Sequence, residues 1–459
     1  MVNSEWKIEN IRYLRLKFNE EKTEMENLTA TIKGGQIPEG KVKVSGAKNA
    51  ATKLLAAALI SDEKITLKNF PTELVDANYK FNFIRDCGGE VQVDRSKETV
   101  LINAKGIEDI ILSDYNYHFR TTYLLVPGFI KRNGIARIPY PGGCKIGNRG
   151  YDLHIKVWEQ LGAKVEEKED YIEVKAPNGF RPAEIDFPIS TIGGTESALI
   201  CASITQGTTT IKNAYISPEV QDLINFLQTI GVKIKVVGNS YIEITGKTYL
   251  QGSIFEVMPD RIEALTWIIY GILSGGNITI EDVPFESMEI PLIHLFEAGI
   301  DLYMNSKNVH VTPDCLRNGI IQPFELATGT HPGVISDMQP FFTLLGLHAN
   351  GTSKIFDYRY PERLKYCAEL SKLYPQQISW ITGAITTSGK HGVLPKNAEV
   401  LSTDLRGSMA LVIGALLGEG ISTIYNVEMA LRGYNKLEEK LKKLGIIIQV
   451  QKEKIGELS

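Results

Sequence analysis

Apolar and polar positions along the chain follow a pattern that returns roughly every 70 residues, as in proteins built from a repeated structural unit. Each unit holds a helix that is apolar almost all round, a short strand rich in β-branched residues, an amphipathic helix and a further strand. The third unit predicts these elements over residues 196–204, 207–213, 220–230 and from Gly231 onward. Its amphipathic helix has one apolar face, because Val220, Leu223, Ile224 and Leu227 are spaced i, i+3, i+4 and i+7.

Six such units follow one another. The first predicts a helix over 50–60, a strand over 65–69 and a helix ending at Cys87, and the sixth predicts elements over 409–417, 421–424 and 437–444. The others surround Gly134, Gly276 and Gly351, and the unit at Gly351, the fifth, lacks the glycine that closes the second helix elsewhere. A helix that is apolar on every side must be covered on every side. We therefore predict an α/β fold of two domains with three units each, rather than an open solenoid.

Composition agrees with a soluble globular protein. The chain has 459 residues, too many for one ordinary core, with 43% hydrophobic and 23% charged residues. Its longest apolar runs, 264–273 and 409–418, reach about half the length of a membrane span. Residues 1–27 form a charged extension without the apolar region of a signal peptide. We expect a cytoplasmic protein that associates with no membrane.

Charge and cysteine usage narrow the function further. A net charge of −4 argues against a general nucleic-acid partner, although it leaves room for a local basic pocket. The five cysteines have no paired spacing and the seven histidines form no ligand pattern, so we expect neither disulfides nor a metal. One cysteine stands apart, because Cys144 lies in the glycine-rich stretch 141–154, five residues before Arg149. A turn so rich in glycine does not belong to a packed core, and a thiol beside a guanidinium suggests a lid over an anionic ligand.

Charged residues recur where the apolar helices should begin. These positions are Lys48-Asn49, Arg120, Thr195-Glu196, Arg261, Asp337-Met338-Gln339 and Arg406. A cation at a helix N-terminus is repelled by the helix dipole unless an anion lies between them. We therefore predict a shared anion site where the two domains face each other. Each residue alone has an ordinary alternative: a surface ion pair for a lone arginine, a helix cap for Asp337, and a polar loop position for His154.

Several ordered segments carry a specific resemblance. They are Ser45-Gly46-Ala47-Lys48-Asn49, Phe119-Arg120-Thr121, 141–154, Met258 to Glu263, Ser336-Asp337-Met338-Gln339, Thr403 to Ser408, and Arg432-Gly433-Tyr434. From about Gly34 to Val450 the chain resembles the enolpyruvyl transferases. It is most similar to the branch that serves peptidoglycan precursor synthesis, because the shikimate-pathway synthases lack the cysteine loop.

The resemblance implies a fold and a reaction. The family fold has two domains of three βαβαββ units, an inside-out α/β barrel, with the active site in the cleft between them. We expect the first domain over 48–257 and the second over 28–47 and 258–459. The implied reaction transfers the enolpyruvyl group of phosphoenolpyruvate to the 3-hydroxyl of UDP-N-acetylglucosamine. It implies no cofactor, and we see no sign of an obligate protein partner.

The resemblance also assigns roles to residues. Lys48, Arg120, Arg149 and Arg406 match the cations that hold phosphoenolpyruvate. Cys144 matches the general acid, which is also the thiol that fosfomycin alkylates, and Asp337 matches the general base. The remaining expected substrate contacts are Asn49, Asp152, Leu153, His154, Thr191, Gly193, Arg261 and Phe356.

Some positions depart from the family pattern. Gly150 replaces a proline, residues 189–193 lack a lysine, 334–336 do not read Phe-Pro-Thr, and the segment around Phe356 is shorter than usual. These positions lie on the acceptor side, so a different nucleoside or nucleotide-sugar acceptor is an alternative. A catalytically silent, nucleotide-sugar-binding paralogue is another, against which stands the joint presence of Lys48, Cys144, Asp337 and Arg406.

Overall fold

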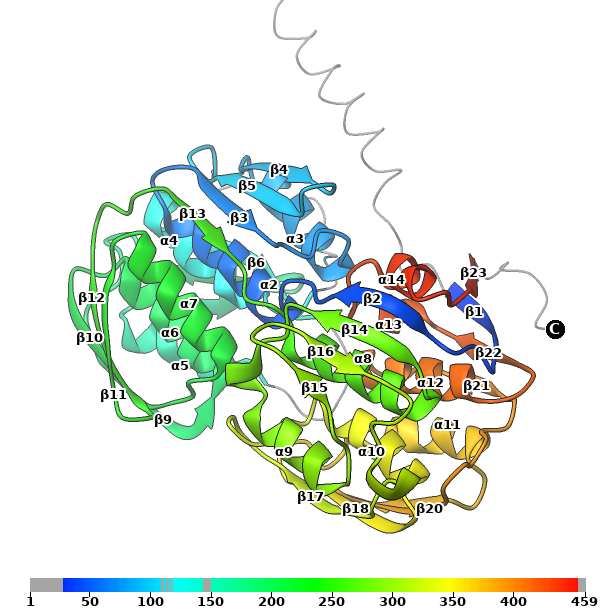
Figure 1. Ribbon diagram of the computed structural model, residues 1–459. Helices are drawn as coiled ribbons and strands as arrows, with labels where there is room; N and C mark the ends of the chain where they lie inside the picture. Colours follow the sequence, from blue (N-terminus) through cyan, green and yellow to red (C-terminus); the bar gives the residue numbers. More distant parts are fainter. Residues whose placement is uncertain are drawn as a thin grey trace, which may run out of the picture.

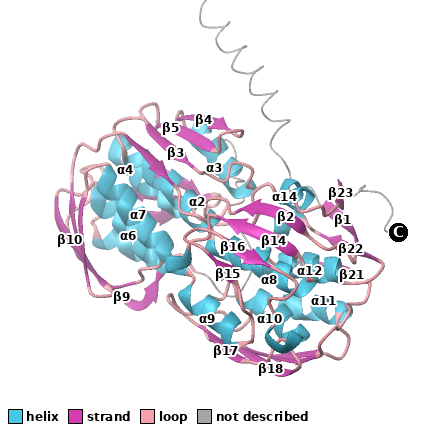
Figure 2. Cartoon of the chain, viewed as in Figure 1, coloured by secondary structure: helices cyan, strands magenta, loops and turns pink. Residues whose placement is uncertain are grey.

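The chain folds into two lobes in which sheets enclose helices. The computed structural model describes residues 28–452, except 109, 110, 113, 114, 116, 118 and 143–149. One cluster of buried side chains runs from Ala47 to Val257 and defines the first lobe. A second cluster unites Ala30–Val44 with Ile262–Ile446 and defines the second lobe. Figure 1 shows helices at the centre of each lobe and strands around them, and Figure 2 shows the same layering by element type. The predicted fold class is confirmed, while the predicted domain limits stay a prediction.

Six sheets are formed by the described residues, three in each lobe. Those of the first lobe are, in strand order, β13 (Ser253–Glu256), β3 (Ile65–Lys68), β5 (Thr99–Asn103), β4 (Glu90–Asp94); β6 (Ile135–Pro139), β8 (Tyr171–Lys175), β7 (Lys164–Glu167); and β11 (Lys233–Val237), β12 (Tyr241–Gly246), β10 (Gly207–Ala214), β9 (Glu184–Thr191). Those of the second lobe are β15 (Tyr303–Met304), β16 (Val309–Val311), β14 (Asn277–Glu281), β2 (Glu39–Lys43); β17 (Glu325–Thr328), β18 (Gly351–Asp357), β20 (Ala384–Gly389), β19 (Ile378–Ile381); and β21 (Glu399–Leu401), β22 (Ile421–Tyr425), β1 (Leu28–Lys33), β23 (Ile448–Lys452).

The sheets repeat one pairing scheme. Five of them contain one parallel pair of strands: β13 with β3, β9 with β10, β2 with β14, β17 with β18 and β21 with β22. The unit's next two strands then continue antiparallel, as β3–β5–β4 does. Parallel neighbours need a crossover, and a helix supplies it. This arrangement is consistent with the βαβαββ unit that the resemblance implies.

Each unit contributes one central helix. These are α2 (Lys48–Ala57), η2 with α4 (Thr122–Leu125 and Val126–Asn133), α6 (Ile192–Ser203), α8 (Arg261–Ser274), α10 (Gln339–His348) and α12 (Leu405–Leu417). Helix α12 illustrates their environment, because every side chain from Arg406 to Leu417 is buried. Such a helix is stable only inside a closed layer of sheets, since its apolar surface has no solvent-facing side. No helix of the described residues is long and apolar enough to cross a membrane.

The second helix of each unit follows the unit's first strand. These helices are α3 (Val75–Asp86), α5 (Asp152–Gln160), α7 (Pro218–Thr229), α9 (Glu289–Glu297), α11 (Lys365–Leu373) and α14 (Leu437–Lys443), with α13 (Glu428–Leu431) preceding the last. The apolar face predicted for 220–230 is confirmed, because Val220, Leu223, Ile224 and Leu227 are all buried in α7. Ser217 caps this helix by accepting a hydrogen bond from the Val220 amide at 3.3 Å.

Two neighbouring segments connect the lobes. The Ala47 amide donates to the Met258 carbonyl at 2.7 Å, and the Asp260 amide donates to the Ser45 carbonyl at 2.8 Å. Gly46 is required at this crossing, because a Cβ there would lie 1.8 Å from the Asn69 carbonyl oxygen. Strands β1 and β2 precede the first lobe in sequence, but they pair with strands of the second lobe and belong to it. The arrows labelled β1 and β2 in Figure 1 show this placement.

Most charged positions expected at helix starts agree with the structure, whereas the helix ranges 196–204 and 409–417 begin four residues too late. Helices α2, α8, α10 and α12 begin at Lys48, Arg261, Gln339 and Leu405, within one or two residues of the expected positions. Helix α6 begins at Ile192 rather than at Thr195, because the Thr191 side chain accepts from the Gly194 amide and caps the helix earlier.

The fifth unit differs where its closing glycine is missing. In the other five units the second residue after this helix is a glycine with positive φ, namely Gly88, Gly162, Gly231, Gly299 and Gly445. In the fifth unit Gln376 takes this conformation, with φ of 64°. A residue with a Cβ is strained in the left-handed region.

We expect Gln376→Gly to raise the free energy of unfolding by about 1 kcal/mol, because glycine adopts positive φ without the Cβ clash. Denaturant titration of the two proteins measures this difference. Gln376→Ala is the matched control and should give no gain, since alanine keeps the Cβ. A lower unfolding midpoint for the glycine variant would contradict this account of the fifth unit.

Candidate active site between the two lobes

Asp337 lies in the loop that joins β17 to α10, at the face of the second lobe turned to the first. Its Oδ1 accepts a hydrogen bond from Arg363 Nη1 at 2.5 Å, and its Oδ2 lies 3.6 Å from Arg406 Nε. Asn49 reaches it from the first lobe, with Nδ2 3.5 Å from Oδ2. The side chain is 25% exposed. The alternative that Asp337 is a helix cap is wrong, because no side chain caps α10.

Arg363 holds two carboxylates together. Besides Asp337, its guanidinium donates from Nη2 to Asp404 Oδ1 at 3.0 Å, and the residue is buried. Asp404 in turn caps α12 by accepting from the amides of Arg406 and Gly407. Burial opposes the charge of Arg363, but the two carboxylates outweigh this effect and raise its pKa. Arg363 therefore fixes Asp337 relative to the start of α12.

Arg406 occupies the first turn of α12 and is almost completely buried. Its Nη2 lies 3.9 Å from Asp260 Oδ2, and its Nη1 donates to the Gly433 carbonyl at 3.3 Å. The guanidinium also lies over the Tyr434 ring, 5.1 Å from the centroid. Its neighbours therefore compensate a charge that burial alone would disfavour.

Asp76 links the first lobe to the second. Lys48 Nζ lies 3.0 Å from Asp76 Oδ2, while Arg432 of the second lobe donates to Oδ1 from Nε and Nη2 at 3.0 and 2.8 Å. Burial alone would raise the pKa of Asp76, but Lys48 and Arg432 together lower it. The Lys48 amide also donates to Asp260 Oδ2 at 3.3 Å. The structure thus brings Lys48, Asn49, Asp337 and Arg406 to one place between the lobes.

A second group of predicted residues lies within the first lobe, around α5 and α6. His154 is buried and stacks on Tyr123, with ring centroids 3.5 Å apart. Burial and the nearby Arg120 lower its pKa to about 3, so its ring is neutral at physiological pH. A Cβ on Gly193 would lie 3.0 Å from this ring. The alternative that His154 is a polar loop residue is wrong, because it belongs to the first turn of α5.

Other predicted residues are placed differently. Asp152 and Leu153 begin α5, with Asp152 exposed, and Thr191 caps α6. Arg261 is buried and bound to Glu219 through Nε at 2.9 Å and Nη2 at 3.2 Å. Phe356 lies near the end of β18 and stacks on Tyr358, with centroids 6.2 Å apart. Cys144 and Arg149 lie outside the described residues.

Two carboxylate partners of the cations, Asp76 and Glu219, were missed by the sequence reasoning. The repeat predicted an anion near the cations at the helix starts, and carboxylates of the protein occupy that role for three of them: Asp76 at Lys48, Glu219 at Arg261, and Asp337 with Asp260 at Arg406. Arg363 was also missed. Asp260, Asp337 and Arg432 did carry a signal, since each lies in a segment that matched the family.

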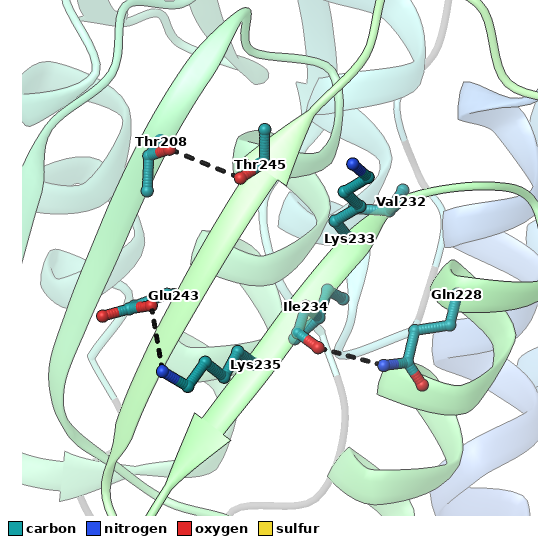
Figure 3. A pocket seen from close by; sticks show the side chains of 8 residues that line it. All are labelled: Thr208, Gln228, Val232, Lys233, Ile234, Lys235, Glu243 and Thr245. Carbon is teal, nitrogen blue, oxygen red and sulfur yellow. Dashed lines mark hydrogen bonds and ion pairs between the residues drawn. The ribbon is translucent and has the colours of Figure 1, made fainter.

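A pocket elsewhere on the first lobe contains none of the predicted residues. It lies over β10, β11, β12 and α7 (Figure 3), where Gln228 Nε2 donates to the Ile234 carbonyl at 3.0 Å. Lys235 and Glu243 form an exposed ion pair at 4.0 Å across the strands. These are ordinary contacts of a solvated sheet face. Among the described residues no group of three or more His, Cys, Asp or Glu side chains is arranged to hold a metal.

Comparison with known proteins relates the chain to one family. The family model described as EPSP synthase (3-phosphoshikimate 1-carboxyvinyltransferase) matches residues 32–441. A UDP-N-acetylglucosamine 1-carboxyvinyltransferase from Beijerinckia indica is 36% identical over 433 residues, which cover 91% of this chain and 97% of that protein. The enzyme of the same name from Aliarcobacter butzleri is 36% identical over 425 residues, covering 92% and 99%.

Solved structures share the fold at lower identity. The enolpyruvyl transferase NikO from Streptomyces tendae superposes with a TM-score of 0.82 at 23% identity, covering 94% of this chain and all of that chain. EPSP synthase from Acinetobacter baumannii superposes with a TM-score of 0.71 at 16% identity, covering 93% of this chain. These two similarities support the architecture described above.

We expect Arg363→Met to lower the free energy of unfolding by about 3 kcal/mol, because Asp337 and Asp404 would lose their shared buried partner. Lys212→Met is the control: it removes an exposed ion pair with Glu184, 2.6 Å long, and should cost less than about 1 kcal/mol. Denaturant titration at pH 7 measures both values. Equal effects of the two substitutions would show that the Arg363 contacts do not stabilise the second lobe.

Proposed function

The chain belongs to the enolpyruvyl transferase family, within the group of UDP-N-acetylglucosamine 1-carboxyvinyltransferases, and we propose that it catalyses their reaction. It would transfer the enolpyruvyl group of phosphoenolpyruvate to the 3-hydroxyl of UDP-N-acetylglucosamine and release phosphate. The observation that carries this proposal is the meeting of Lys48, Asn49, Asp337 and Arg406 between the lobes. Such a cluster supplies cations for a phosphorylated substrate and a carboxylate for a hydroxyl proton.

The proposed chemistry is an addition followed by an elimination. Cys144 protonates the methylene carbon of phosphoenolpyruvate, which creates an oxocarbenium-like centre at the neighbouring carbon. The sugar hydroxyl attacks that carbon while Asp337 takes its proton, giving a phosphorylated ketal. Loss of phosphate, with loss of a proton from the new methyl group, restores the double bond. The reaction involves no net oxidation or reduction of the two substrates.

The binding cations act on the phosphate. We assign Lys48, Arg120, Arg149 and Arg406 to phosphoenolpyruvate, since preorganised positive charge stabilises the departing anion. Lys48 and Arg406 already lie next to carboxylates, so their side chains are held in place before substrate arrives. This preorganisation reduces the cost of arranging them during the reaction.

Asp337 is suited to act as the base through one oxygen. Arg363 engages Oδ1, whereas Oδ2 faces Asn49 across the space between the lobes. We assign Oδ2 to the acceptor hydroxyl and Asn49 to the sugar beside it. Arg363 would then be a positioning residue, because it sets the direction of the carboxylate without contacting the acceptor.

The remaining residues belong to the acceptor side of the proposal. We assign Phe356 to the sugar and Asp152, Leu153, His154, Thr191 and Gly193 to the nucleotide. His154 is buried, neutral and stacked on Tyr123, so it would contribute to the nucleotide side through its packing next to Gly193. Arg261 would act indirectly, since Glu219 already binds its guanidinium in a buried pair.

We expect Asp337→Asn to lower kcat by about 100-fold or more, because the amide cannot take the hydroxyl proton. The measurement is phosphate release from phosphoenolpyruvate with UDP-N-acetylglucosamine, with the product mass checked for one added enolpyruvyl group. Asp170→Asn, at an exposed position of the first lobe, is the matched control and should retain the parent rate.

Measurements of turnover and binding distinguish the proposed function from its two alternatives. Turnover with UDP-N-acetylglucosamine that survives Asp337→Asn would refute the assigned base. Binding of phosphoenolpyruvate without turnover would refute the acceptor and favour a different nucleoside or nucleotide sugar. Absence of both binding and turnover would favour the silent paralogue.

We expect one thiol to react with fosfomycin or iodoacetamide at pH 7.5, and that thiol to be Cys144. Burial raises the pKa of Cys87 to about 12, of Cys367 to about 12 and of Cys315 to about 11, and it raises the pKa of Cys201 as well. Such thiols are protonated and unreactive. Intact-mass measurement should show one adduct on the parent and none on Cys144→Ala; an adduct on that variant would contradict the assignment.

A further inference from the structure

Lys80 is a buried lysine that the proposed reaction does not use. It belongs to α3 and has no exposed surface. Its ammonium donates to the Thr52 carbonyl at 2.5 Å and to Thr121 Oγ1 at 2.7 Å. It also lies over the Phe119 ring, 5.4 Å from the centroid. An ammonium has three N–H groups, and these contacts account for them without water.

The two hydrogen bonds of Lys80 connect the parts of the first lobe to which we assign phosphoenolpyruvate cations. Thr52 lies one turn after Lys48 on α2, and its hydroxyl donates to the Lys48 carbonyl at 3.2 Å. Thr121 directly follows Arg120. The Phe119 carbonyl in the same segment accepts from the Gly142 amide at 3.1 Å. Lys80 thus ties the segment 119–121 to the start of α2.

Stability does not explain this lysine. Burial, and to a smaller extent the charge of Lys53, lowers the pKa of Lys80 to about 7, although the charges of Asp76 and Glu196 act in the opposite direction. Because the unfolded chain holds this proton up to the ordinary lysine range, burial of Lys80 costs stability at pH 7 and below, and less as pH rises above 7. A methionine of similar length would avoid that cost.

We propose that Lys80 is a positioning residue for phosphoenolpyruvate binding, which holds Arg120 against α2 and adds positive charge behind the site. This inference rests on the function proposed above. The groups that face its ammonium are Lys53 on α2, Asp76 on its own helix and Glu196 on α6. As pH rises through neutrality the ammonium loses its proton, so phosphoenolpyruvate affinity falls and KM for phosphoenolpyruvate increases.

The decisive substitution is Lys80→Met. In this variant the Thr52 carbonyl remains part of helix α2 and Thr121 remains partly exposed. Neither former partner of Lys80 is therefore left as an unpaired polar group in the core. We expect KM for phosphoenolpyruvate to rise about 10-fold, as on losing hydrogen bonds to a charged group, with less change in kcat and in the acceptor KM. The melting temperature should be unchanged or higher. The increase of KM between pH 6 and pH 8.5 that the parent shows should be absent.

Two further variants keep the test decisive if Lys80→Met fails to fold. Thr121→Val removes the link to the 119–121 segment and retains the lysine, and it should also raise KM for phosphoenolpyruvate. Lys131→Met is the matched control, because Lys131 is a largely buried lysine of the same lobe that bonds the Ile60 carbonyl at 2.7 Å and Asp62 at 2.6 Å. It should lower the melting temperature and leave KM unchanged.

The outcomes separate the two proposals. If the parent binds phosphoenolpyruvate and both Lys80→Met and Thr121→Val bind it equally well, the role of Lys80 is refuted and the function stands. A pH dependence of KM that persists in Lys80→Met refutes the contribution of its charge. A parent that does not bind phosphoenolpyruvate, measured by calorimetry with the pure compound, refutes both proposals.

Discussion

Buried charge is the constraint on which the arrangement of the two lobes depends. Helices α2, α8 and α12 carry a charged residue in their first turn, and an unpaired charge in a protein interior costs several kcal/mol. Each of these groups therefore needs an opposite charge, and the chain supplies it from another element. Asp76 of the first lobe binds Arg432 of the second; Asp337 is paired with Arg363 and Arg406 of its own lobe and also accepts from the neutral amide of Asn49 in the first lobe. The pairing that removes the cost of burial also brings the lobes together.

The apolar helices explain why these charges lie where they do. Helices such as α8 and α12 are buried along almost their whole length, so sheets must surround them and only their ends can reach another part of the molecule. The charged first turns of α2, α8 and α12 consequently meet between the lobes. Capping by Asp260 and Asp404 places further carboxylates at the same level. The repeat thus concentrates polar groups in one region without a long loop to carry them.

The repeated pattern made the fold predictable from the sequence, because each unit repeats the same local signals. The helix and strand order and the buried face of α7 followed from hydrophobic spacing, and the charged residues marked the starts of α2, α8 and α12. The ion pairs did not follow. Asp76 and Arg432 are 356 positions apart, and nothing in the amphipathic pattern of α3 distinguishes Asp76 from a solvated residue. Arg363 was missed, and His154 was not expected to be buried, for the same reason, since the burial of both depends on neighbours distant in sequence.

One contact between the lobes, on the acceptor side, bears on a departure from the family pattern. Residues 189–193 lack the lysine that the family commonly has there. In this region Arg359, which follows β18 in the second lobe, donates from Nη2 to the Ser190 carbonyl at 2.9 Å. A guanidinium therefore lies next to the segment that has lost a lysine, and it comes from the opposite lobe. An arginine held by a backbone carbonyl keeps its charge and has further donors for an anion. The missing lysine consequently does not leave this side without positive charge, which weakens the argument that the sequence made for a different acceptor.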